Sequence, residues 1–315
     1  MKPERPSSAG FQPLLPLGSG GMGTAWLCRA LGAGEFERLV VVKRPHAHVV
    51  EREDAMLRFT DEARLTGSLH HANVVGTHQV GEDEIGPFIV LEYIEGASLD
   101  ELVERCTTLG EKVPVQVALR IALDALSGLE AAHTAHDHAG RPLNILHRDI
   151  SLQNLLVGVD GVCRVADFGA AKSDVRKYST DQRYLLGKLL YLPPEYLRRD
   201  ETGPTLDIYS LGITLWQTLA GVELWKDQSE AQVVASIIEG KIPKVSEYAN
   251  VPAELDALIA KATATDLKQR FQSAQLMAEA IESLGRDLGL LAPHSEVARW
   301  AKRLIADELQ ARRQR

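Results

Sequence analysis

The sequence predicts an α+β protein of two lobes, a small strand-rich lobe that contains one helix and a larger, mainly helical lobe. Three observations predict this class. Short β-rich runs around one helical stretch occupy the first third of the chain, apolar residues recur at helical spacing through the rest, and no repeat of about 20 to 50 residues is present. A composition of 45% apolar and 25% charged residues over 315 residues also provides a sizeable core.

The small lobe is expected over residues 12–94 and follows a leader, residues 1–11, whose Pro, Ser and charged residues predict disorder. Runs of β-branched and apolar residues indicate its strands, and apolar residues three and four positions apart indicate its helix. In chain order, the strands are expected at residues 25–30, 39–43, 74–80 and 88–91, with the helix at 53–69 between the second and third.

The large lobe is expected over residues 95–285, with a helical extension at 286–315. Residues 211–220 are apolar nearly all round, which indicates a buried central helix that is too short for a bilayer. In the extension, apolar residues between Val297 and Leu309 share one helical face, which favours packing onto the large lobe over docking of a partner. The helices of the lobe itself are expected at 99–106, 115–136, 208–220, 231–239, 253–264 and 273–284.

Charge and cysteine usage narrow the class of protein. Against 43 Asp and Glu there are 35 Lys and Arg, so the net charge of −8 offers no basic field for nucleic acid or anionic lipid. Cys28, Cys106 and Cys163 lie far apart and form no C-x-x-C pair, which fits packed thiols in a reducing compartment. With no apolar run of about 18 residues and no signal-like start, we expect a cytoplasmic protein without nucleic-acid binding or membrane insertion.

A glycine-rich segment with the pattern G-x-G-x-x-G reads Gly18-Ser19-Gly20-Gly21-Met22-Gly23. The pattern alone allows several interpretations. A Walker loop requires Lys and then Ser or Thr after its last glycine, whereas Thr24 follows directly. A dinucleotide fingerprint opens a helix, but the residues after Thr24 are typical of a strand. A hairpin whose backbone amides approach a triphosphate and a merely flexible turn remain.

Lys43 ends an apolar run of three valines, where an ammonium is costly unless it meets an anion. Its expected partners are phosphate oxygens and a carboxylate. Glu62 is the candidate carboxylate, because it shares a face of the predicted helix with Phe59 and Thr66. Taken singly, Lys43 and Glu62 are each better explained as surface charges.

The most specific signal is the segment His147-Arg-Asp149-Ile-Ser151-Leu-Gln-Asn154, followed by Asp167-Phe-Gly169. Phosphoryl transfer requires an oxygen that aligns the attacking hydroxyl, ligands for Mg²⁺ and fixed positive charge on the phosphates. Asp149 would accept the hydroxyl proton. Asn154 and Asp167 would hold Mg²⁺, and Lys43 would contact the phosphate oxygens.

On these motifs, residues 12–285 resemble the eukaryotic-like Ser/Thr protein kinases of the bacterial type. Tyr191-Leu-Pro-Pro-Glu195 is similar to the family's A-P-E, and Asp207-Ile-Tyr-Ser-Leu-Gly212 to its D-x-W-x-x-G. The resemblance implies a bilobal protein-kinase-like fold and transfer of the γ-phosphoryl group of ATP to protein substrates, with Mg²⁺ or Mn²⁺. It also implies that Glu195 pairs with a buried Arg270 and that Asp207 braces the catalytic loop.

The resemblance further implies how the nucleotide lies. Leu91 would be the gatekeeper, the Glu92 carbonyl and the Ile94 amide would meet the adenine edge, and Ser98 falls where the ribose is usually contacted. The nucleotide-binding residues implied in this way are Leu17, Gly18, Ser19, Gly20, Gly21, Met22, Gly23, Ala25, Val41, Lys43, Leu91, Glu92, Ile94, Ser98 and Leu156.

Two departures from the family fall at the phosphate end. Ser151 stands where these kinases usually carry a lysine, and Lys188 stands where they usually carry a threonine. We predict a swap, in which Lys188 supplies the missing ammonium and Ser151 is its hydroxyl partner. The alternative to a swap is that the usual lysine and the usual threonine were lost independently in a weakened enzyme. The alternative function is a pseudokinase scaffold that binds nucleotide or partner proteins with little or no turnover. The segment after Asp149 lacks the pattern typical of tyrosine kinases, which favours serine or threonine acceptors.

Regulation is expected through residues 172–183, which are polar and basic. A phosphate on Ser179 or Thr180 would be drawn to Arg148 and would order the segment, whereas the alternative is a merely polar loop. A regulatory protein partner is a further expected source of input. The histidines from His133 to His138 do not converge on one face, so we interpret them as a solvated helix end and not a metal site.

Overall fold

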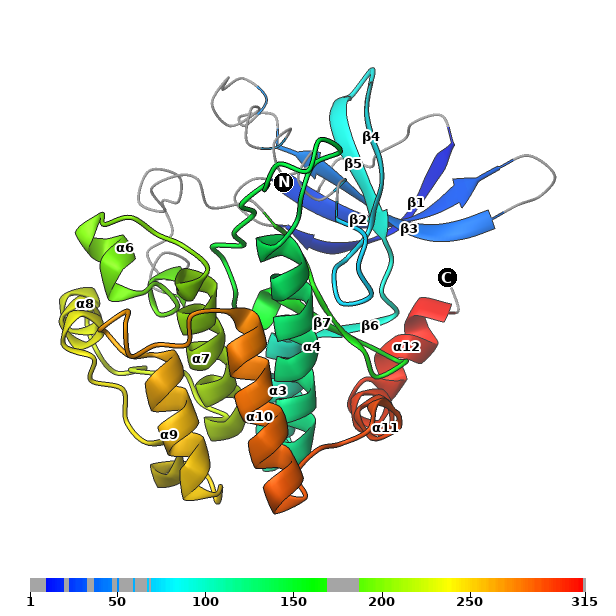
Figure 1. The fold of residues 1–315 in the computed structure, drawn as a ribbon. Helices are drawn as coiled ribbons and strands as arrows, with labels where there is room; N and C mark the ends of the chain where they lie inside the picture. Colours follow the sequence, from blue (N-terminus) through cyan, green and yellow to red (C-terminus); the bar gives the residue numbers. More distant parts are fainter. Residues whose placement is uncertain are drawn as a thin grey trace.

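The first lobe is an antiparallel sheet of five strands in the order β1-β2-β3-β5-β4 (Figure 1). Successive side chains of a strand point to opposite faces of the sheet. Val40 and Val42 of the third strand are buried with Trp26 and Phe88, while Val41 and Lys43 point toward the second lobe. The strands are β1 (Phe11–Ser19), β2 (Gly23–Leu31), β3 (Glu37–Pro45), β4 (Thr77–Asp83) and β5 (Gly86–Glu92).

The structure is a computed structural model, which describes residues 10–19, 23–32, 37–46, 50, 59, 67, 69–168 and 187–313. Most of the helix expected at 53–69 lies outside these ranges. The leader was expected to reach residue 11, but Phe11 already pairs with Ala30 in the sheet, and its ring packs edge to face on Phe88. The strand expected at 74–80 begins only at Thr77, since Val74 instead makes an isolated bridge to Val165.

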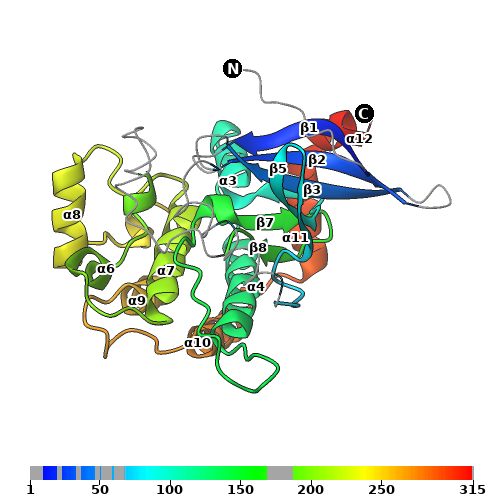
Figure 2. The same ribbon diagram turned by 90° about the horizontal axis from the view of Figure 1, so that it is seen from above.

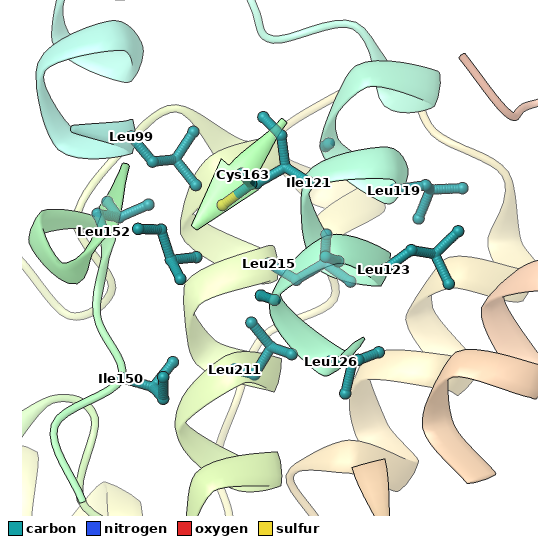
Figure 3. Close-up of a cluster of buried hydrophobic side chains, with 14 of the residues drawn as sticks. Leu99, Leu119, Ile121, Leu123, Leu126, Ile150, Leu152, Cys163, Leu211 and Leu215 are labelled. Atoms are coloured by element: carbon teal, nitrogen blue, oxygen red, sulfur yellow. The ribbon is translucent and has the colours of Figure 1, made fainter. Parts of the chain in front are cut away.

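The second lobe is helical and surrounds one central helix, α7 (Thr205–Ala220), in which every residue from Leu206 onward is buried. Figure 3 shows Leu211 and Leu215 of α7 in one buried cluster with Leu126 of α4 (Val115–His133) and, at its edge, Leu99 of α3 (Leu99–Thr108). The outer helices begin and end close to the predicted positions, except for a short helix after Pro193 that was not predicted. They are α6 (Pro194–Arg198), α8 (Glu230–Glu239), α9 (Ala253–Ala262) and α10 (Ala274–Leu288), with short 3-10 turns η2 (Leu152–Asn154) and η4 (Val245–Glu247).

A three-stranded sheet lies between the lobes, in the order β6-β7-β8. Its strands are β6 (Gly96–Ser98), β7 (Leu155–Gly158) and β8 (Cys163–Val165). Strands this short carry too few alternating residues to be recognised from the sequence. They matter because β7 directly follows the catalytic loop, residues 147–154, and β8 directly precedes the segment that contains Asp167.

The extension forms two helices, α11 (His294–Leu304) and α12 (Ala306–Arg313), and not the single helix expected from residue 295. Val297, Trp300 and Leu309 are buried in the core of the second lobe, so the apolar face packs there. The chain turns at Ile305, and α12 then runs toward the first lobe beside β6 (Figures 1 and 2). Within the described ranges, no helix combines the length and apolar character that a membrane crossing requires.

Candidate active site

Lys43 and Asp167 meet at the inner end of the cleft between the lobes. The Lys43 ammonium donates to Asp167 Oδ1 at 2.9 Å, although the two residues are 124 positions apart. The positive charge of Lys43 is the main cause that lowers the pKa of the Asp167 carboxyl group. It outweighs burial, which raises that pKa. Asp167 is therefore ionised at neutral pH. Its φ of +60° is unusual for a residue other than glycine, and such conformations are found at functional sites.

Asp149 and Asn154 form the second part of the site. Asn154 Nδ2 donates to Asp149 Oδ2 at 3.0 Å and to the Asp149 carbonyl at 2.7 Å. These contacts use the amide nitrogen, so the side-chain oxygen is the atom suited to a cation. The turn η2 positions this pair, and the Ala166 amide donates to the Asn154 carbonyl, which places Asp167 next to them.

Lys188 also binds Asp149. Its ammonium donates to Asp149 Oδ2, so a cation from position 188 lies beside the catalytic loop. The predicted partnership with Ser151 is not present, because Ser151 Oγ is buried without a hydrogen bond to any described residue. The structure therefore supports the relocated ammonium but not the hydroxyl half of the predicted swap.

The catalytic loop is fixed from below by Asp207, as the resemblance implied. The Asp207 carboxylate accepts from the His147 amide at 2.9 Å, the Arg148 amide at 2.7 Å and His133 Nε2 at 2.8 Å. Complete burial raises the pKa of Asp207, but the His133 hydrogen bond and the other partners outweigh it and lower the pKa below its usual value. The prediction of a solvated helix end was wrong for His133, because tertiary packing encloses it against Asp207.

We expect Asp207→Asn to lower the free energy of unfolding by about 3 kcal/mol at pH 7, because two backbone amides lose a charged acceptor. The folded-state pKa of Asp207 lies below its unfolded value of about 3.9, so its contribution is complete above that pH and declines as the pH falls through the folded pKa. Urea denaturation of both proteins at pH 7 and pH 3.5 should show the difference shrinking in acid. An equal difference at both pH values would contradict this.

His147 has a structural role, as expected. It is fully buried, its Nε2 lies 2.8 Å from the Ala166 carbonyl, and its ring packs edge to face on Phe168. Burial lowers the pKa of His147, so the ring is neutral at pH 7. A neutral, enclosed imidazole orients the loop and does not exchange protons with solvent.

A cleft of about 530 Å³ opens between the lobes around these groups. Apolar side chains of Ala25, Val41 and Leu156 line one part, and Lys43, Asn154 and Asp167 line another. This donor set fits a Mg²⁺–nucleotide complex, because an ammonium suits phosphates and carboxylate and amide oxygens suit Mg²⁺. The predicted nucleotide residues that line the cleft are Leu17, Gly18, Ala25, Val41, Lys43, Leu91, Glu92, Ile94, Ser98 and Leu156.

Several predicted site residues do not line this cleft or lie outside the described structure. Gly23 pairs with Pro45, and a Cβ on it would lie 2.1 Å from the Arg44 carbonyl oxygen, so this hairpin requires glycine there. Ser98 does line the cleft, but its Oγ accepts from the Glu101 amide at 3.2 Å and caps α3. Those outside the described residues are Gly20, Gly21, Met22, Glu62, Thr66, Ser179 and Thr180, and the side chain of Ser19.

Among the residues of the cleft wall that sequence reasoning missed are Tyr93 and Arg312. Tyr93 lies between Glu92 and Ile94, whose backbone carbonyl and amide were predicted to meet the adenine edge. The same resemblance could therefore have placed Tyr93 at the cleft. Arg312 lies in α12, and no local pattern marked it, because a terminal arginine on an amphipathic helix is ordinarily solvated.

A second groove of about 570 Å³ adjoins the catalytic loop. Its lining includes Ser151 and Lys188 as well as the carboxylates of Asp100, Glu104 and Glu223. An open, charged groove beside Lys188 suits an extended peptide better than a small molecule.

Glu195 and Arg270 form the buried ion pair that the resemblance implied. Arg270 Nη1 lies 2.6 Å from Glu195 Oε1, and Nη2 lies 3.1 Å from Oε2. The guanidinium also donates to the Thr205 and Ala264 carbonyls. Arg270 thus ties α6 to the start of α7 and to the segment after α9.

Comparison with known proteins gives a consistent result. The family model described as the protein kinase domain matches residues 11–281. "Tyrosine-protein kinase MasK" of Myxococcus xanthus is 34% identical over 288 residues, which cover 88% of this chain and 45% of that protein. "Serine/threonine-protein kinase PknL" of Mycobacterium tuberculosis is 30% identical over 270 residues, 85% of this chain and 64% of that protein. This chain therefore spans less than two thirds of either relative.

The solved structures agree in fold. The kinase domain of Mycobacterium tuberculosis PknI superposes with a TM-score of 0.65, covering 88% of this chain and 97% of that one at 22% identity. At this identity the likeness shows the bilobal fold alone.

Proposed function

This chain belongs to the protein kinase family, and on that premise we propose that it transfers the γ-phosphoryl group of ATP to serine and threonine hydroxyls of protein substrates. The observation that carries the proposal is the meeting of Lys43 with Asp167 and of Asp149 with Asn154 at one cleft. The names of relatives such as PknL support serine and threonine as acceptors. The groove beside Lys188 supports a protein acceptor.

Each side chain then has a defined task. ATP bound in the cleft supplies the phosphoryl group, and Mg²⁺, or Mn²⁺ in its place, neutralises charge on the phosphates. Asn154 and Asp167 would hold the metal through oxygen atoms, and Lys43 would orient the phosphates. Asp149 accepts a hydrogen bond from the substrate hydroxyl and takes its proton as the phosphoryl group transfers. Asp207 keeps Asp149 in place through the two loop amides that it binds.

Incubation with γ-labelled ATP, Mg²⁺ and a generic protein acceptor tests the proposal. We expect label on the acceptor, and acid hydrolysis should release phosphoserine or phosphothreonine. A fluorescent ATP analogue measures binding in parallel. Binding without label transfer would favour the pseudokinase scaffold instead, and neither binding nor transfer would overturn both functions.

A tyrosine acceptor is the second candidate, favoured by the name of the relative MasK. The exchange of residues at positions 151 and 188 also removes two features typical of Ser/Thr kinases. The same hydrolysis decides, because phosphotyrosine as the main product would replace serine and threonine as the proposed acceptors.

We propose further that Lys188 supplies the cation that position 151 lacks. Its ammonium contacts Asp149, and its side chain is 14% exposed, so the charge is held in the site. In this position it stabilises the charge that develops between Asp149 and the phosphoryl group.

We expect Lys188→Met to lower kcat about 10- to 100-fold, the effect of losing one charged hydrogen bond in the transition state. Lys226→Met, on the wall of the same groove, is the matched control. The double variant Ser151→Lys/Lys188→Thr returns the cation to its usual position and should recover activity relative to Lys188→Thr. A wild-type kcat in Lys188→Met would contradict this role and would support independent losses of the usual lysine at position 151 and the usual threonine at position 188.

We propose a cytoplasmic location and a regulatory protein partner. The three cysteines are free and buried, which suits a reducing compartment. Burial raises the pKa of the Cys28 thiol to about 11 and that of Cys163 well above its usual value, so both remain unreactive thiols. The net charge of −8 supports protein substrates over nucleic acid.

A further inference from the structure

The last described turn of α12 touches the segment that joins the two lobes. Arg312 Nη1 donates to the Gly96 carbonyl at 2.8 Å. Gly96 begins β6 and lies two residues after Ile94, whose amide faces the proposed adenine position. Arg312 also lines the cleft itself, together with Tyr93 and Ser98. A helix from the end of the chain therefore contributes to the wall of the nucleotide site.

Arg312 is held in this position by a chain of charges. Glu308, one turn earlier on α12, pairs with Arg312 and accepts from Arg105 of α3 at 2.5 Å. Arg105 also donates to Glu101 at 2.9 Å and to the Leu304 carbonyl at 3.2 Å. The charges thus run from α3 through Glu308 to Arg312 and the Gly96 carbonyl.

The burial of Arg312 distinguishes this contact from an incidental one. Its side chain is only 17% exposed, whereas arginines on a terminal helix usually remain in solvent. Burial lowers the pKa of Arg312, but Glu308 and Tyr93 outweigh it, so the guanidinium stays charged. A charged group that binds a backbone carbonyl beside the cleft restricts where that backbone can move.

Packing of the extension does not require this contact. Val297, Trp300 and Ile305 are buried in the second lobe and anchor α11 and the start of α12. Arg312 lies beyond that apolar anchor, at the mouth of the cleft. Its contribution to nucleotide binding can therefore be measured separately from the stability of the lobe.

We propose that Arg312 is a nucleotide-positioning residue, through which α12 holds the Tyr93–Gly96 segment in the geometry that binds the adenine and ribose of ATP. This inference rests on the proposed function, because it concerns the same cleft. Loss of the contact lets the segment relax, so nucleotide affinity falls while the chemical step is retained.

Binding of a fluorescent ATP analogue with Mg²⁺ to the full chain tests this. We expect Arg312→Gln to raise the Kd about fivefold or more, in the range typical of coupling between sites, with little change in Tm. Glu308→Gln, which frees Arg312 from its partner, should act in the same direction, and Arg312→Lys should recover part of the affinity. The matched control is Arg303→Gln on α11, which breaks an exposed pair with Glu111 after α3; neither residue lines the cleft.

Turnover gives a second readout. The KM for ATP should rise in Arg312→Gln while kcat stays within about twofold of wild type, as expected for lost ground-state binding. Wild-type Kd in both Arg312→Gln and Glu308→Gln overturns the role of Arg312 but leaves the kinase function intact. A wild-type protein that binds no nucleotide overturns the proposed function, and this inference with it.

Discussion

We expect Asp149→Asn to lower the rate of phosphoryl transfer by about 100- to 10,000-fold, the usual effect of removing a general base. The amide keeps the size of the carboxylate and can still accept a hydrogen bond from Lys188, but it cannot take the substrate proton. Lys43 and Asp167 are untouched, so nucleotide binding should remain close to wild type. Transfer of label from ATP to a protein acceptor, with nucleotide Kd measured on the same samples, provides the check.

The matched control is Asp287→Asn, an exposed carboxylate on α10. This variant should transfer phosphate at the wild-type rate. Equal rates in Asp149→Asn and wild type would show that the proton is accepted elsewhere and would remove Asp149 from the mechanism.

We expect Arg270→Ala to lower the free energy of unfolding by about 3 to 5 kcal/mol, the typical cost of leaving one buried charge without its partner. Arg270 is fully enclosed, and the Glu195 side chain is only 5% exposed. The substitution also leaves the Thr205 and Ala264 carbonyls without the donor they bind. Urea denaturation at pH 7 measures the change.

Two further variants separate charge from packing. Lys241→Ala removes an exposed pair with Glu239 and should change stability little. The double variant Glu195→Leu/Arg270→Met removes both charges and should recover part of the loss, because no isolated charge stays buried. A loss below about 1 kcal/mol in Arg270→Ala would mean that water reaches Glu195 and that the pair does not anchor α6.

Much of the fold was accessible from local patterns. The run of apolar and β-branched residues at 39–43 predicted a strand, and β3 places Val40 and Val42 in the core and Lys43 in the cleft. The helices of the second lobe begin and end near their predicted positions. The positions of Asp207 and Arg270 were implied by family resemblance and are confirmed by their hydrogen bonds.

The misses share a physical cause. His133 was predicted to lie at a solvated helix end, but packing against α7 encloses it. Ser151 was predicted to be a partner of Lys188, but its hydroxyl is buried without a hydrogen bond to any described residue. The single helix expected at the end of the chain turns at Ile305, where side chains on both sides of the turn enter the core. In each case contacts from distant segments outweighed local preference.

The sequence by itself determined which residue types the site contains and on which elements they lie, because strand and helix periods and the motif around Asp149 are local properties. Only the tertiary structure decided which charges meet. Lys188 reaches Asp149 across 39 positions, and Arg312 reaches Gly96 across 216. Such pairings depend on how whole elements pack. The local periodicity of the sequence does not indicate which distant residue a side chain will contact.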